Sequence, residues 1–294
     1  MKGQQYMQGE MAGLPEKPAR AAALTVGVFD GVHLGHAAIL GRLKELASVE
    51  GFLPAAITFR THPDTVLHPG AGEVFLITSV EHRVRLLQKS GCRQVAALDF
   101  TPDFARTSAG EFIRMIRERF DARVLVLGED ARIGSGGEAA EESRELVRSL
   151  GMRIETVPAV VVNGEKVSST LIRRRIYETR LEEAAALLGR RFSSYGSIVP
   201  GRRRGSRLGF PTLNLDVMRE VRPPFGVYAG WAAIEGAGIF RAAANVGFRP
   251  TFGKSAEPLV EVHVINEDLP DMYGRKAEFI YAAKVRDESL FPSP

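Results

Sequence analysis

The chain is 294 residues long, with 45% hydrophobic and 25% charged residues and a formal net charge of +4. Such a length and composition are typical of two compact domains and exclude disordered and collagen-like proteins. The longest apolar stretches, such as residues 157–162, fall far short of the roughly 20 residues that a membrane-spanning helix needs. The N-terminal segment lacks the apolar run of a signal peptide, and Cys92 is the single cysteine. We therefore expect a cytoplasmic protein without membrane partners.

Basic residues gather in three short clusters, at residues 173–175, 190–191 and 202–204. Clusters of this kind can contact nucleic acid or small phosphorylated ligands, or can simply lie on solvated surface. No stripe of basic residues interleaved with aromatic residues accompanies them, so the sequence does not favour a nucleic-acid partner. For the quaternary structure we expect a monomer or a weak oligomer.

The first part of the chain alternates short β-branched runs with longer helical periods. This alternation is the signature of a Rossmann-like parallel sheet covered by crossover helices. Ser108 and Glu111 form a capping-box pattern ahead of an amphipathic run, and a short helix over residues 181–188 closes this part. The expected strands are residues 24–28, 55–59, 95–98, 124–127 and 153–157.

After residue 192 the pattern changes to short alternating runs separated by glycine and proline, which indicates an antiparallel β-barrel. We therefore divide the chain into an α/β domain over residues 1–188 and an all-β barrel domain over residues 189–294. The sequence leaves open whether residues 1–22 are ordered. The expected barrel strands are residues 192–199, 227–234, 240–246, 259–265 and 276–285.

A segment rich in glycine and histidine, residues 27–36, lies where the first strand should lead into the first helix. The carboxyl end of a parallel strand faces the ligand crevice, and the helix N-terminus offers free N–H groups to phosphate. Gly31 and Gly35 allow close approach to a ligand. His33 and His36 are three residues apart, so both can hydrogen-bond charge that develops on one phosphate chain. A lone histidine would more often pack in the core, and a zinc site lacks a third ligand nearby.

Residues 27–36 read Gly-Val-Phe-Asp-Gly-Val-His-Leu-Gly-His and resemble the GxFDGVHxGH signature of the nucleotidyltransferase module of bacterial FAD synthetases. Residues 168–173 resemble the SSTxIR segment of that family, whose hydroxyls, free amides and arginine suit phosphate. Asp130 falls in the flavin and nucleotide pocket of the family, although residues 61–63 and 131–134 depart from its usual pattern. The resemblance implies that His33 and His36 are catalytic and that ATP contacts Gly27, Phe29, Asp30, Gly31, Gly35, Ser168, Ser169, Thr170 and Arg173.

Residues 201–214 begin as a loop rich in glycine and arginine and end as a strand. Thr212 and Asn214 are two residues apart, so their side chains project from the same face of that strand. A hydroxyl and an amide oxygen are hard ligands suited to Mg²⁺ that carries nucleotide phosphates. From the spacing alone, a polar strand face beside a turn is the simpler interpretation.

Residues 208–214 read Leu-Gly-Phe-Pro-Thr-Leu-Asn and resemble the LGFPTxN signature of riboflavin kinases. Segments at 226–229, 245–252, 260–263 and 272–274 resemble other parts of that kinase domain in the same order. Glu261 alternates with valines, as an exposed strand carboxylate does, but the resemblance implies that it is the base toward the primary hydroxyl of the ribityl chain. It further implies Mg²⁺ at Thr212 and Asn214, ATP contacts at Gly201, Gly205 and Gly209, and flavin contacts at Asp130, Phe210, Pro211 and Arg286.

Together these resemblances cover residues 24–291 and imply a bifunctional FAD synthetase. Such an enzyme uses ATP to phosphorylate riboflavin to FMN, and a second ATP to adenylylate FMN to FAD with release of pyrophosphate. The family usually continues into a C-terminal helix where this chain ends at residues 291–294; we therefore expect the barrel domain to lack that helix.

Three alternatives remain open. One is a monofunctional riboflavin kinase with a drifted front domain, in which a substitution of His36 would leave every activity intact. The second is a non-catalytic protein that senses flavin or nucleotide and consumes no ATP. The third is a different adenylyl- or cytidylyltransferase, in which the segment at residues 208–214 would have no role.

Overall fold

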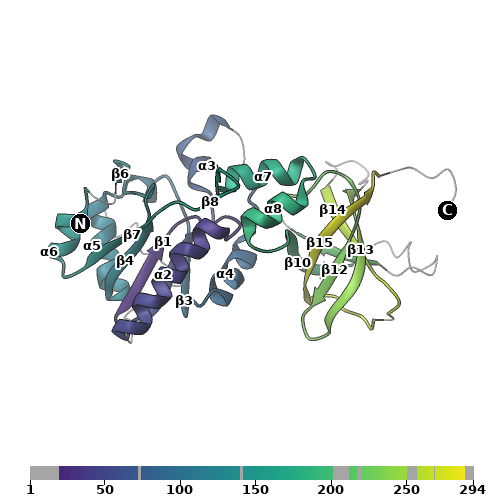
Figure 1. Ribbon diagram of the computed structural model, residues 1–294, viewed down its shortest axis with the longest axis horizontal. Coiled ribbons are helices and arrows are strands. Elements are labelled where there is room, and N and C mark those ends of the chain that lie inside the picture. Colours follow the sequence, from purple (N-terminus) through teal and green to yellow (C-terminus); the bar gives the residue numbers. More distant parts are fainter. Residues whose placement is uncertain are drawn as a thin grey trace. The chain divides into compact units, whose positions relative to one another are not determined.

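The computed structural model describes residues 20–71, 74–139, 142–200, 212–217, 220–249, 257–267 and 269–288. It divides into two compact units, which we describe separately (Figure 1). The first unit contains the residues up to Val74 together with Arg83–Val167, and the second contains Phe75–His82 together with Ser168 and the residues after it. In the described ranges, no helix is long and apolar enough to span a membrane. Most of the segment 1–22, and the chain end where the family helix was expected to be missing, lie outside these ranges.

The first unit is built on a five-stranded parallel sheet in the order β3-β2-β1-β4-β7, which confirms the predicted Rossmann-like fold. The chain first runs outward from β1 to β2 and β3, and then returns to place β4 on the other side of β1. Ligands of open α/β sheets bind where the strand order reverses, outside the carboxyl ends of the strands. The strands are β1 (Ala22–Val26), β2 (Leu53–Phe59), β3 (Gln94–Leu98), β4 (Ala122–Gly128) and β7 (Arg153–Val157).

Helices cover both faces of this sheet (Figure 1). Because strand side chains alternate, Leu125 and Leu127 of β4 pack in one apolar layer with α5 and α6, whereas Val124 and Val126 pack in the opposite layer with α2 and α4. The helices are α2 (Leu34–Glu50), α3 (Pro63–Leu67), α4 (Val80–Lys89), α5 (Ala109–Phe120) and α6 (Arg144–Ser149). Two short hairpins follow β4 and β7, formed by β5 (Arg132–Ile133) with β6 (Glu138–Ala139) and by β8 (Val161–Val162) with β9 (Glu165–Lys166).

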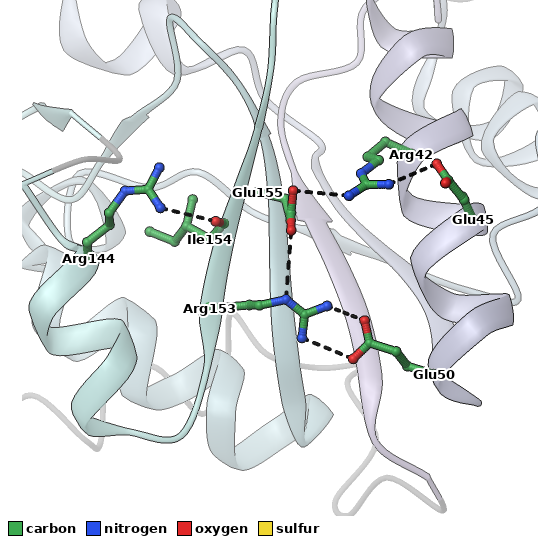
Figure 2. Close-up of polar contacts among 7 residues, drawn as sticks. All are labelled: Arg42, Glu45, Glu50, Arg144, Arg153, Ile154 and Glu155. Carbon is green, nitrogen blue, oxygen red and sulfur yellow. Dashed lines mark hydrogen bonds and ion pairs between the residues drawn. The ribbon is translucent and has the colours of Figure 1, made fainter.

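Ion pairs join α2 to β7, the edge strand of the sheet (Figure 2). Arg42 donates to Glu155 at 3.3 Å, and Arg153 donates to Glu50 at 3.0 Å. Hydrogen bonding from Arg153 lowers the pKa of Glu50. All four side chains are partly exposed, so solvent screens both pairs and each stabilises the fold only weakly. Together they orient α2, the helix that carries His36.

The second unit is a closed antiparallel barrel of six strands in the order β10-β11-β14-β13-β12-β15, as predicted. Side chains such as Leu213, Leu215, Val262 and Phe279 fill its interior and leave a cavity of about 10 Å³. The strands are β10 (Ser193–Val199), β11 (Thr212–Asp216), β12 (Gly226–Ile234), β13 (Gly238–Arg249), β14 (Glu257–Val264) and β15 (Lys276–Arg286), and the helices are α7 (Ser169–Tyr177) and α8 (Leu181–Leu188).

Candidate active sites

His33 and His36 lie at the start of α2, directly after the carboxyl end of β1. The Nδ1 atom of His33 accepts a hydrogen bond from the backbone N–H of His36, and Nδ1 of His36 accepts one from the backbone N–H of His33, both at 3.4 Å. The two rings stack with their centroids 3.6 Å apart. Because both Nδ1 atoms are acceptors, the neutral rings carry their protons on Nε2. Each histidine can therefore donate an Nε2–H group to a phosphate oxygen.

Phe29, Gly31 and Gly35 shape the loop around this pair. The Phe29 ring meets the His36 ring edge-on, with 5.1 Å between centroids. Gly31 has a φ of 78°, which a glycine adopts without strain. A Cβ atom at residue 35 would lie 3.1 Å from Cε1 of His33, so Gly35 leaves space for that ring.

A cavity of about 550 Å³ opens beside the two histidines. It lies where β1 and β4 end, at the point where the strand order reverses. One wall is aromatic: Phe59, Phe100 and Phe104 contact one another, with 5.4 Å between the first two rings and 5.6 Å between the last two. This combination suits a planar ring system joined to phosphate. The predicted site residues that line the cavity are Gly27, Phe29, His33, Gly35, His36 and Asp130.

Asp30 and Gly31 do not line the cavity. They lie in the turn behind the histidines, where Asp30 is buried at 2% exposure. Their contacts with ATP stay predictions.

The predicted phosphate-binding segment at residues 168–173 begins α7, in the second unit. The Oγ atom of Ser168 accepts a hydrogen bond from the backbone N–H of Leu171 at 3.2 Å and so caps the helix. Ser169 and Thr170 occupy the first turn, and Arg173 follows within the helix. Val167, the residue before Ser168, belongs to the first unit and lines its cavity.

Polar residues form a row across the outer face of three barrel strands. The strand register pairs Asn214 of β11 with Glu261 of β14, and Glu261 with Asn245 of β13. Side chains of directly paired residues lie on the same face, with about 4.5–5.5 Å between their Cβ atoms. Thr212 lies on this face too, two residues before Asn214, and is paired with His263.

The donor set of this row fits a hard cation. Thr212 and Asn214 offer a hydroxyl and an amide oxygen, which are ligands that suit Mg²⁺ together with phosphate oxygens and water. Asn214 is buried at 7% exposure, whereas Asn245 and Glu261 are partly exposed. The described part of the chain contains no cluster of three or more His, Cys, Asp or Glu side chains that could hold a metal ion.

Arg286 lies at the exposed end of β15. It pairs with Val227 of β12, which in turn pairs with Asn245, so Arg286 is two strands away from the polar row. Its guanidinium donates to the carbonyl of Asp287 at 3.0 Å. The remaining predicted residues, Gly201, Gly205, Gly209, Phe210 and Pro211, lie outside the described ranges.

Comparison with known proteins shows one family for both halves of the chain. A family model described as FAD synthetase matches residues 16–171, and one described as riboflavin kinase matches residues 188–294. A relative from Listeria monocytogenes is 31% identical over 91% of this chain and 85% of its own length, and one from Escherichia coli K12 is 31% identical over 95% and 89%; both are named bifunctional riboflavin kinase/FMN adenylyltransferase. The chain belongs to this family.

A solved structure shares the fold over nearly the whole chain. It is described as a macrolide-efflux protein from Streptococcus pneumoniae, with a TM-score of 0.80 and 30% sequence identity over 95% of this chain and 90% of that one. The shared fold is that of the bifunctional riboflavin kinase/FMN adenylyltransferase family to which this chain belongs.

Two residues that were not among the predicted site residues lie at the candidate sites. Lys166 of β9 lines the cavity and pairs with Asp130, and this hydrogen bond raises the pKa of Lys166. Asn245 stands beside Glu261. Lys166 has no signal of its own in the sequence, because it meets Asp130 across 36 residues. Asn245 begins the segment 245–252 that resembles the kinase family, but only the register of β13 and β14 brings it beside Glu261.

Proposed function

We propose that this protein catalyses two consecutive ATP-dependent transfers, phosphorylating riboflavin to FMN and then adenylylating FMN to FAD with release of pyrophosphate. The observation that carries this proposal is that both family models match one chain in order. Each model covers one half of the chain, and each half contains one of the two candidate sites. We assign residues 1–188 to the FMN adenylyltransferase domain and residues 189–294 to the riboflavin kinase domain.

In the kinase step, the primary hydroxyl oxygen of the ribityl chain attacks the γ-phosphorus of ATP, and the bond to the bridging oxygen of ADP breaks. We assign Glu261 as the base that takes the hydroxyl proton. Thr212 and Asn214 would hold Mg²⁺, which offsets negative charge on the phosphates when it is bound. We retain as predictions the ATP contacts of Gly201, Gly205 and Gly209 and the flavin contacts of Phe210, Pro211 and Arg286.

In the adenylylation step, a phosphate oxygen of FMN attacks the α-phosphorus of ATP, and the bond to the β-phosphate breaks. We assign His33 and His36 as donors of Nε2–H bonds to phosphate oxygens whose charge grows during attack. The aromatic wall of the cavity suits a flavin or adenine ring. The further predicted contacts are Asp130 for flavin and Gly27, Phe29, Asp30, Gly31, Gly35, Ser168, Ser169, Thr170 and Arg173 for ATP.

A time course on the purified chain tests this proposal. The protein is incubated with riboflavin, ATP and MgCl₂, and riboflavin, FMN and FAD are separated by chromatography at intervals. We expect FMN to appear first and FAD to follow. FMN without FAD would restrict the activity to the barrel, and bound flavin without any product would favour a sensor.

The remaining expectations stay predictions that simple measurements can check. We expect chelation of Mg²⁺ to stop product formation and light scattering to show a monomer or a weak oligomer. The absence of nucleic-acid and membrane partners and the cytoplasmic location also stay predictions.

A further inference from the structure

Two residues of the loop between β1 and α2 have an unfavourable backbone conformation. Phe29 and Val32 have φ angles of 53° and 41°, in the left-handed region that side chains with a Cβ avoid. The branched Cβ of Val32 makes this conformation especially costly, and such residues cost about 1–3 kcal/mol each. They persist only where surrounding structure enforces them. His33, the first of the two proposed catalytic histidines, follows Val32 directly.

Two buried side chains from other elements hold this loop by one carbonyl. The Nη1 atom of Arg83, on α4, donates to the carbonyl oxygen of Val28 at 2.5 Å. The Oγ1 atom of Thr58, at the end of β2, donates to the same oxygen at 2.8 Å. Both Arg83 and Thr58 are fully buried, at 0% exposure. Val28, whose carbonyl oxygen accepts both bonds, directly precedes Phe29, the first residue of the loop with the unfavourable backbone conformation.

A fully buried arginine is expensive, since removing a charge from water costs several kcal/mol even after relaxation. A methionine of similar size would fill the same space without that cost, so packing does not account for Arg83. Asp30, on the same loop, is also buried, at 2% exposure. Replacement of such buried charges by well-packed apolar side chains is often neutral or stabilising, so the stability of the fold does not account for Arg83.

We propose that Arg83 is a positioning residue for adenylyl transfer, which fixes the loop over residues 27–32 and thereby the positions of His33 and His36. This inference rests on the proposed adenylylation function. Arg83 touches neither histidine; it acts through the Val28 carbonyl and the loop that leads into the N-cap of α2. A shift of about 1 Å in a catalytic group can lower a rate roughly 100-fold.

The test compares four variants of the full chain: Arg83→Met, Arg83→Lys, Thr58→Val and the control Lys89→Met, which removes an exposed cation from the same helix. FAD formation is measured from FMN and ATP, and FMN formation from riboflavin and ATP. We expect Arg83→Met to lower kcat for FAD formation by about 100-fold with little change in KM for ATP. Arg83→Lys and Thr58→Val should show smaller losses, and Lys89→Met none. Far-ultraviolet circular dichroism reports whether the first unit of each variant is folded, and FMN formation, which we assign to the barrel, should stay unchanged.

A second readout does not depend on activity. The imidazole ¹⁵N shifts of His33 and His36 report which ring nitrogen is protonated, and we expect them to change in Arg83→Met and to stay unchanged in Lys89→Met. Wild-type kcat and shifts in Arg83→Met would overturn the role of Arg83, as would a loss of both activities in Arg83→Lys and Thr58→Val. A wild-type chain that forms no FAD would instead refute the proposed function.

Discussion

The His33 ring occupies space that a side chain at residue 35 would take. A Cβ there would lie 3.1 Å from Cε1 and 3.2 Å from Nδ1 of His33, so the ring would have to move. Since Nδ1 accepts the hydrogen bond from His36, that movement disturbs both histidines. We predict that Gly35→Ala lowers the rate of FAD formation from FMN by about 10-fold.

Gly41 provides the matched control on the same helix. An added Cβ at this position meets nothing within 4 Å, and alanine favours a helix over glycine by up to about 1 kcal/mol. Gly41→Ala should therefore retain both activities. Equal rates of FAD formation in the two variants would contradict the role assigned to Gly35.

Asn214 allows a test of the proposed Mg²⁺ site at the scale of one side chain. Loss of its amide oxygen removes one of the two proposed protein ligands. We predict that Asn214→Ala raises the Mg²⁺ concentration for half-maximal FMN formation by about 10-fold, which corresponds to roughly 1.4 kcal/mol. Formation of FAD from added FMN is the internal control, and a matching rise in its Mg²⁺ requirement would argue against this assignment.

Among the elements, α5 shows what a local sequence pattern can predict. The backbone N–H of Ser108 donates to the Glu111 carboxylate at 2.9 Å, and the Oγ of Ser108 accepts from the Glu111 backbone N–H at 3.3 Å, which confirms the predicted capping box. The Ser108 hydroxyl, which donates to the Glu111 carboxylate at 2.7 Å, and the Ser108 backbone N–H lower the pKa of Glu111. Because both partners are three residues apart, the start of this helix could be predicted without any knowledge of the fold.

The segment Phe75–His82 shows what such patterns miss. It lies within the first part of the sequence but packs in the unit of the barrel. Glu220 holds it there: the carboxylate accepts from the Ser79 backbone N–H at 2.7 Å and from the Tyr195 backbone N–H at 3.1 Å, and it lies 3.2 Å from Nδ1 of His82. No periodic pattern joins residues that stand so far apart in the chain.

Removal of this carboxylate should destabilise the barrel unit. Glu220 is 1% exposed, and its loss leaves His82 and two backbone donors without their partner. We predict that Glu220→Ala lowers the free energy of unfolding by about 3–5 kcal/mol, measured by urea denaturation with the fluorescence of Trp231, the single tryptophan. The exposed Glu235→Ala should change it by less than about 0.5 kcal/mol. Similar urea midpoints for the two variants would refute the importance of this contact.

His82 should make the stability of the same unit depend on pH. Burial lowers its pKa, but the hydrogen bond to Glu220 and the Glu278 carboxylate, 3.6 Å from Nε2, together outweigh burial and raise the pKa above its ordinary value. The stabilisation is therefore complete below the ordinary histidine pKa of about 6.5 and is lost as the pH rises through the raised value. We predict that the difference in urea midpoint between the wild type and His82→Gln is largest near pH 6 and shrinks at higher pH. A difference independent of pH would contradict this prediction.

For the molecule as a whole, two sites in separate units predict two separable activities. Glu261→Gln should lower FMN formation by about 100- to 10,000-fold, because a general base contributes that factor, and should still convert added FMN to FAD. His36→Ala should accumulate FMN from riboflavin and form little FAD. Chromatography of a mixture of the two variants should show FAD again, because FMN released by one can be used by the other. If either variant lost both activities, the two sites would not be independent.

A feature could be predicted from the sequence when the residues that determine it lie close together in the chain. The strand at residues 153–157 and the helix at 181–188 have the predicted bounds, and His33 with His36 follows from spacing within one helical turn. The two-residue strands of the hairpins β5–β6 and β8–β9 were missed, because so short a run carries no measurable period.

The sequence by itself determined the two fold classes, the strand-to-helix loop with its histidines and the alternation that turns Glu261 outward. Each of these depends on neighbours within a few residues. Only the tertiary structure decided that Arg83 meets the Val28 carbonyl across 55 residues and that Asn245 stands beside Glu261. Those contacts depend on which strands pair, in which register, and on which helix covers the loop. The packing of the whole unit determines the strand pairing, the register and the position of the helix, and none of these produces a periodic pattern in the sequence.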